Sequence, residues 1–143
     1  MGKKRIIKKG EVGSGESAST ASKKKIKRRV ARGFVYINST YNNTIITLTD
    51  ETGAVLSSGS AGSLGFSGAK KGTPYAASKV ATQLMERAQT IGMQEICIYV
   101  RGVGAGRESA IRSIAAGGLT IGMIKDITPV PFNGPKPPKM RRV

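Results

Sequence analysis

Residues 95–115 read EICIYVRGVGAGRESAIRSIA: an apolar segment, a glycine-rich turn and a helical pattern in direct succession. The segment 96–100 is continuously apolar, which is typical of a strand covered on both faces, and such strands are usually parallel and connected by helices. Gly102, Gly104 and Gly106 mark the turn, and apolar residues then recur at helical spacing. This unit predicts an α/β domain.

A longer helix is predicted before this unit. Thr73 followed by Pro74 indicates a helix start, because Thr caps the first turn and Pro fits the first helical position. Gly92 is the expected end, which gives a helix of about 18 residues. The side chains expected on its buried face are those of Ala77, Val80, Ala81, Leu84, Ala88 and Ile91.

Four further segments have strand composition or position. Residues 34–37 and 44–49 are rich in β-branched and aromatic side chains, and 41–43 link them in a turn, since Asn tolerates positive φ. A short strand at about 54–58 completes an antiparallel meander, and a last strand runs from about 120 to 128. The order is βββαβαβ, which predicts a mixed five-stranded sheet of ribonuclease H-like topology with helices packed on it.

The charge of the chain is large and unevenly placed. It holds 24 Lys and Arg against 8 Asp and Glu, a net charge of +16, which favours a polyanionic partner such as nucleic acid. Residues 1–32 hold 12 basic and 2 acidic side chains, and residues 129–143 hold 4 basic and none acidic. The sequence therefore predicts a basic flexible N-terminal extension (1–32), a globular domain (33–128) and a Pro-rich basic C-terminal tail (129–143).

The composition also excludes several kinds of site. With one Cys and no His, the chain has no intramolecular disulfide and no zinc-site spacing, and we expect neither metal nor cofactor. Cys97, between two isoleucines, is predicted to be a small buried residue rather than a nucleophile. No apolar run reaches the ~18 residues that a membrane span needs, so a soluble, intracellular protein is expected.

The glycine-rich turn has two functional interpretations. Closely spaced glycines at a helix N-terminus allow main-chain N–H groups to bind an anion, and Arg107 adds donors. The anion belongs either to a nucleic-acid backbone or to a dinucleotide. The dinucleotide alternative would make the protein a nucleotide-dependent enzyme. Asp126 favours it, because it lies about as far after the glycines as the carboxylate that binds the ribose of a dinucleotide. The glycine spacing is against it, since it is G-x-G-x-G rather than G-x-G-x-x-G.

Two other groups of residues are candidates for binding nucleic acid. Lys70 and Lys71 lie in a glycine-rich loop close to the start of the long helix, where a phosphate has room to approach. Phe34, Tyr36 and Tyr41 give a weaker alternative, a single-strand binder, because aromatics are only 5% of the chain and clear stacking positions are not evident.

Several motifs together resemble one family. They are Asn42-Asn43-Thr44, Ser60-Ala61-Gly62, Gly65-Phe66, Thr73-Pro74-Tyr75-Ala76-Ala77, Gly102-x-Gly104-x-Gly106-Arg107-Glu108-Ser109-Ala110-Ile111-Arg112 and Asp126-x-Thr128-Pro129-x-Pro131-x-Asn133-Gly134. From about residue 33 onward the chain resembles small-subunit ribosomal protein S11, and its closing residues 137–143 are similar to the bacterial branch. The resemblance implies a structural, non-catalytic protein that binds small-subunit ribosomal RNA in the platform, near the exit site and the messenger RNA path.

The resemblance also implies partners and RNA-binding residues. The expected neighbours are platform proteins of families S7, S18 and S21, in a cytoplasmic or organellar ribosome and with no membrane. The residues matched to the family's motifs are Asn42, Asn43, Lys70, Lys71, Gly102, Gly104, Gly106, Arg107, Asn133, Gly134, Arg141 and Arg142. The basic residues of the two extensions join this set: Lys23, Lys24, Lys25, Lys27, Arg28, Arg29, Arg32, Lys136 and Lys139.

Overall fold

The structure, a computed structural model, describes residues 29–136, 138 and 139. Its strands are β1 (Arg32–Ser39), β2 (Thr44–Asp50), β3 (Val55–Ser60), β4 (Glu95–Arg101) and β5 (Thr120–Asp126). Its α-helices are α1 (Pro74–Ile91) and α2 (Gly106–Ala115), and two short 3-10 helices, η1 (Gly62–Leu64) and η2 (Gly68–Gly72), lie between β3 and α1. The order βββαβαβ is the predicted one.

All five strands form one mixed sheet with the spatial order β3-β2-β1-β4-β5. The first three strands are an antiparallel meander, because β2 pairs antiparallel with both β1 and β3. β4 pairs in parallel with β1 and with β5, so only β2 runs against the others. This confirms the predicted sheet of ribonuclease H-like topology.

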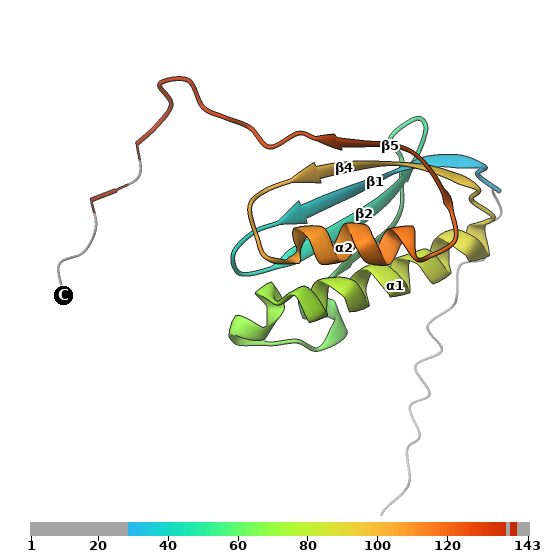
Figure 1. Cartoon of the computed structure of the whole chain (residues 1–143), viewed down its shortest axis with the longest axis horizontal. Coiled ribbons are helices and arrows are strands. Elements are labelled where there is room, and N and C mark those ends of the chain that lie inside the picture. Colours follow the sequence, from blue (N-terminus) through green and yellow to red (C-terminus); the bar gives the residue numbers. More distant parts are fainter. Residues whose placement is uncertain (1–28, 137, 140–143) are drawn as a thin grey trace, which may run out of the picture.

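Both helices pack on the same face of the sheet (Figure 1). Alternate residues of the strands point into this layer: Val35 and Ile37 of β1 and Ile98 of β4 are almost completely buried. All six side chains predicted for the buried face of α1 are buried as well. The core is therefore a single layer between the sheet and the two helices.

The other face of the sheet, which we call the open face, carries Phe34, Tyr36, Cys97 and Tyr99, and no helix of the described part of the chain packs on it (Figure 1). This corrects the expectation that the segment 96–100 is covered on both faces. Along β4 buried residues alternate with partly exposed ones, and Cys97 is among the latter, so the prediction that Cys97 is buried was wrong.

The ends of α1 confirm the signals in the sequence. The Thr73 side chain accepts a hydrogen bond from the Ala76 N–H (3.3 Å), and Pro74 is the first helical residue. Gly92 ends the helix with φ of 89°, a conformation that costs glycine little, and its N–H donates to the carbonyls of Ala88 and Gln89. These local interactions fix where α1 begins, which matters because the candidate site lies at that end.

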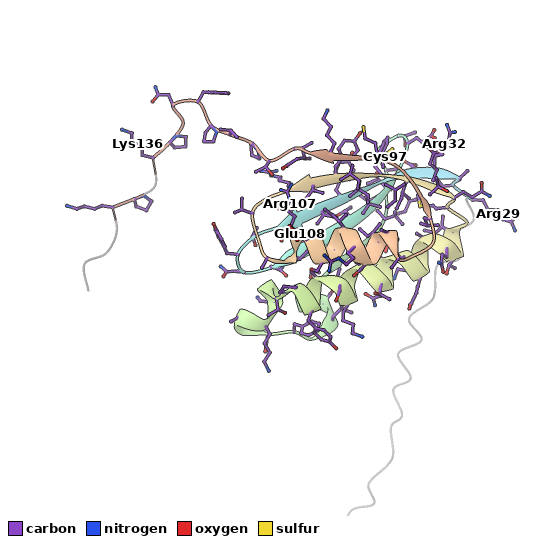
Figure 2. The ribbon with its side chains drawn as sticks, in the orientation of Figure 1. Arg29, Arg32, Cys97, Arg107, Glu108 and Lys136 are labelled. Carbon is purple, nitrogen blue, oxygen red and sulfur yellow. The ribbon has the colours of Figure 1, made fainter. Side chains whose placement is uncertain are left out.

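Of the helices in the described part of the chain, none combines the length and the apolar composition that crossing a membrane requires. Arg29, near one limit of the described chain, lies beside one end of the sheet, and Lys136, near the other limit, lies beyond the opposite end on the extended C-terminal tail (Figure 2). The predicted RNA-binding residues that fall outside the described residues are Lys23, Lys24, Lys25, Lys27, Arg28, Arg141 and Arg142.

Candidate nucleic-acid interface

Three loops meet at the end of the sheet where β1 and β4 finish and both helices begin. They are the β1–β2 link (40–43), η2 and the glycine turn (102–106). Gly72 of η2 lies so close to the Tyr41 carbonyl that a Cβ at this position would collide with it. Gly102 and Gly104 lie equally close to the carbonyls of Ser39 and Thr40. The fold thus brings together residues that are 31 to 64 positions apart in the sequence.

The β1–β2 link is held by Thr40. Its hydroxyl accepts the Asn43 N–H (3.1 Å), and both its hydroxyl (3.0 Å) and its backbone N–H (2.9 Å) donate to the Asn43 carbonyl. Neither Asn42 nor Asn43 has a positive φ, so the link turns for a different reason from the one predicted. Asn42 is exposed at the tip, whereas the side-chain oxygen of Asn43 is buried and has no hydrogen-bond partner among the described residues.

The glycine turn lies directly on the end of β1. The N–H of Gly104 donates to the Ser39 carbonyl (3.0 Å), and the N–H of Gly102 donates to the Thr128 hydroxyl (3.1 Å). Gly104 and Gly106 are buried. The glycines therefore allow close packing, and the two N–H groups are directed to acceptors within the protein rather than to a common anion.

Arg107 ties this turn to the end of β5. Its guanidinium donates to the Gly102 carbonyl (Nη1, 3.0 Å) and to a carboxylate oxygen of Asp126 (Nη2, 2.6 Å). The other Asp126 oxygen accepts the N–H (2.9 Å) and the hydroxyl (2.6 Å) of Thr128. Figure 2 shows Arg107 at the N-terminal end of α2. The network fixes the point at which the C-terminal tail leaves the domain.

These hydrogen bonds favour the charged form of Asp126. The Arg107 guanidinium, followed by the hydroxyl and N–H of Thr128, lowers the pKa of Asp126 well below its ordinary 3.8. Because the pKa is lower in the folded state, the network stabilises the protein above about pH 4, and this contribution is lost as the pH falls further.

We therefore expect Asp126→Asn to lower the melting temperature at pH 7, and the difference from the native chain to shrink between pH 4 and pH 2. Thermal unfolding followed by circular dichroism at pH 7, 4 and 2 measures this. Glu86→Gln is the control, because Glu86 is an exposed α1 carboxylate with no ion pair to a described residue. A difference for Asp126→Asn that is equal at all three pH values would contradict the role of its charge.

Lys70 and Lys71 lie in η2, immediately before α1. Lys70 is exposed and Lys71 is half-buried, with its alkyl chain near Gly62. The N-termini of α1 and α2 also lie together here, since a Cβ at Gly106 would be only 2.8 Å from Cβ of Ala77 in the first turn of α1. Helix N-termini carry partial positive charge, so two dipoles and two lysines give this end a positive potential.

A family model described as Ribosomal protein S11 matches residues 33–142. The chain belongs to the ribosomal protein S11 family. A curated relative from Thermosipho africanus, named Small ribosomal subunit protein uS11, is 56% identical over 119 residues, which are 83% of this chain and 92% of the relative. The predicted family is confirmed.

Membership in the S11 family argues against one of the two interpretations of the glycine turn, the dinucleotide site of an enzyme. The family is structural and non-enzymatic, so this chain has a structural role in the ribosome and takes part in translation. The alternative of a nucleotide-dependent enzyme is therefore set aside. Asp126, the carboxylate that this alternative required, is instead bound to Arg107.

The remaining predicted residues of this S11 family member lie away from the loop cluster. Arg29 is exposed, and Arg32 pairs with Glu95 (2.8 Å) at the opposite end of the sheet. The tail residues Asn133, Gly134, Lys136 and Lys139 are all exposed, and Asn133 has a φ of 54°. Thr40 and Thr128 are the residues that the prediction of the site missed. Thr40 bonds the backbone of Asn43 within the same loop, which is a local signal, whereas Thr128 accepts the N–H of Gly102 from a distant part of the sequence.

Proposed function

We propose that this chain binds small-subunit ribosomal RNA in the platform of the subunit, near the exit site, and that the loop cluster is its main contact on the folded domain. The loop cluster is the β1–β2 link, η2 and the glycine turn. The observation that carries the proposal is that these three loops, which contain most of the predicted RNA-binding residues of the domain, meet at one end of the sheet.

The charges at this end support RNA rather than another anion. Lys70 and Lys71 have no ion-pair partner among the described residues and stand beside two helix N-termini, so a phosphate backbone would neutralise them. Asn42 is exposed at the tip of the link and offers an amide donor and acceptor to a base edge or a sugar hydroxyl. Arg107, whose guanidinium is already paired, acts mainly by shaping the glycine turn.

The two basic extensions enlarge this contact. The tail leaves from the end of the sheet that holds the loop cluster, and Arg29 lies at the other end (Figure 2), so RNA is bound from both sides of the domain. We propose that the tail, with Lys136 and Lys139, lies toward the messenger RNA path. We further propose that its neighbours in the platform are proteins of families S7, S18 and S21, and that the ribosome is cytoplasmic.

We expect Lys70→Ala and Lys71→Ala each to weaken binding to a platform ribosomal RNA fragment and to lower the slope of log affinity against log salt by about one. Filter binding at several salt concentrations measures the slope. Arg87→Ala is the matched control, because it also removes one positive charge. Arg87 lies on α1, about 20 Å along the helix from Pro74, and donates to the Ser57 hydroxyl of β3. Unchanged slopes for both lysine variants would count against the loop cluster.

A further inference from the structure

The open face of the sheet carries a cluster of three aromatic side chains. The rings of Tyr36 and Tyr99 are stacked, with centroids 5.2 Å apart and planes 15° apart. The ring of Phe34 meets both edge-on, at 5.6 Å from Tyr99 and 6.5 Å from Tyr36. These residues come from the adjacent strands β1 and β4, where Tyr36 and Tyr99 are direct partners. The cluster is therefore fixed by the register of the sheet.

This aromatic cluster is partly exposed to solvent. Tyr36 is 37% exposed, and Phe34 and Tyr99 are half-buried. Ile45 and Met123, on the strands that flank β1 and β4, widen the patch at 41% and 43% exposure. A contiguous apolar patch on a charged protein marks a surface that another molecule covers.

Two cationic side chains border the patch on β4 and β5. Arg101 and Lys125 are exposed, and neither has an ion-pair partner among the described residues. In the register of the sheet, Lys125 of β5 lies beside Tyr99 of β4. Arg101 of β4 lies beside Asn38 of β1, at the end of the sheet next to the loop cluster. The open face thus continues from the loop cluster as a strip that alternates aromatic, amide and cationic groups.

At its far end the strip contains a shallow hollow. The hollow is lined by Gly33, Phe34, Cys97, the Arg32–Glu95 ion pair and a second acidic residue, Glu51. An aromatic wall beside two carboxylates and a guanidinium offers a stacking surface together with acceptors and donors, which is the combination that an unpaired base uses.

From this surface we infer that the open face binds unpaired nucleobases of RNA. The inference rests on the proposed function and deepens it: the loop cluster binds the phosphate backbone, and the aromatic cluster stacks bases of the same RNA. A sheet bearing exposed aromatics beside cations is suited to this, because every base has a π-face and the cations bind the flanking phosphates. Exposed aromatics would also suit a protein partner, but Arg101 and Lys125, which have no ion-pair partner among the described residues, favour RNA because its phosphates neutralise them.

The test compares the full-length native chain with the double variant Tyr36→Leu/Tyr99→Leu for binding to a platform ribosomal RNA fragment. We expect affinity to fall about tenfold or more, because base stacking is lost, while the salt slope stays the same, because no cation is removed. Tyr36→Phe/Tyr99→Phe keeps the rings and should keep the affinity.

Photo-crosslinking of the native chain in small subunits gives a second, independent result. Base adducts on Tyr36, Cys97 or Tyr99, found by mass spectrometry, would support the inference even if the leucine variant failed to fold. Crosslinks from these residues to another ribosomal protein, or to residues 1–28 of the same chain, would overturn it. So would full affinity of a folded leucine variant. Failure of the proposed function can be told apart from failure of this inference, because in the first case the native chain itself would not bind the RNA.

Discussion

Removal of residues 1–28 is expected to weaken binding to ribosomal RNA by a factor of about a thousand or more at moderate salt. This segment holds 10 basic and 2 acidic side chains, half of the net charge of +16. Each phosphate contact contributes close to one unit to the salt slope, and six to ten contacts change affinity by about 10³ to 10⁵ over a modest range of salt. Filter binding across salt concentrations should therefore show a lower affinity and a shallower slope.

The structure indicates where this truncation must stop. The Ala31 carbonyl accepts the N–H groups of Gln94 (2.9 Å) and Glu95 (3.1 Å), and Val30 packs against the core. A chain that begins at Arg29 keeps these contacts and should give the circular dichroism spectrum of the native domain. A chain that begins at Gly33 loses them together with the Arg32–Glu95 ion pair and should be less stable.

A full-length variant with the ten basic residues of 1–28 replaced by Gln is the matched control. It preserves chain length and removes charge alone, so it should bind as weakly as the truncated chain. Native affinity in either protein would show that the segment is not an RNA-binding extension, and loss of the fold on removal of residues 1–28 would show that it is part of the domain.

The elements that the sequence predicted well are those whose signals are local. Thr73 and Pro74 begin α1 through contacts within one turn, and Gly92 ends it through its own φ of 89°. Parallel pairing of β4 was predicted from its apolar run and the neighbouring helical patterns. Because such signals lie within a few residues of the element they define, no tertiary information was needed.

The faces of β4 were predicted wrongly although the sequence contains the necessary pattern. Glu95, Cys97, Tyr99 and Arg101 alternate with fully apolar residues, which is the period of a strand with one buried face. The segment reads as continuously apolar only if Cys and Tyr are counted as core residues. Tyr carries a polar group and often lies at a boundary, so its place on the open face was open to prediction.

The site was predicted as a set of residues but not as an arrangement. Arg107 and Asp126 were assigned to different roles, and the structure joins them in one ion pair. The turn at 41–43 was predicted because Asn tolerates positive φ, but neither Asn42 nor Asn43 has one, and the Thr40 hydroxyl holds the link instead. The Arg107–Asp126 pair depends on which segments meet in space, and a single sequence does not specify this, whereas the Thr40–Asn43 contact is a local signal that the prediction missed.

Gly104→Ala is expected to destabilise the domain by about 3 kcal/mol or more, a large part of the stability of a domain of this size. A Cβ at this position would collide with the Thr40 carbonyl oxygen and lie 2.8 Å from its carbon and 2.5 Å from the Ser39 hydroxyl oxygen. These atoms belong to β1 and its link, which the sheet holds in place. Urea denaturation followed by circular dichroism measures the free energy of unfolding.

Two other glycines separate the causes of this effect. Gly53 has a φ of 87° with open space around it, so Gly53→Ala reports backbone strain alone, about 1 kcal/mol. Gly62 has no positive φ, and a Cβ there would have its nearest neighbour at 3.8 Å, so Gly62→Ala should be nearly neutral. If Gly104→Ala were as stable as the native chain and yet bound RNA poorly, the glycine would act at the RNA surface. We expect instead that Gly104→Ala loses stability first and RNA binding only as a consequence. Gly104 is buried and its N–H donates to the Ser39 carbonyl, so its role is to pack the turn against β1 and hold the loop cluster together.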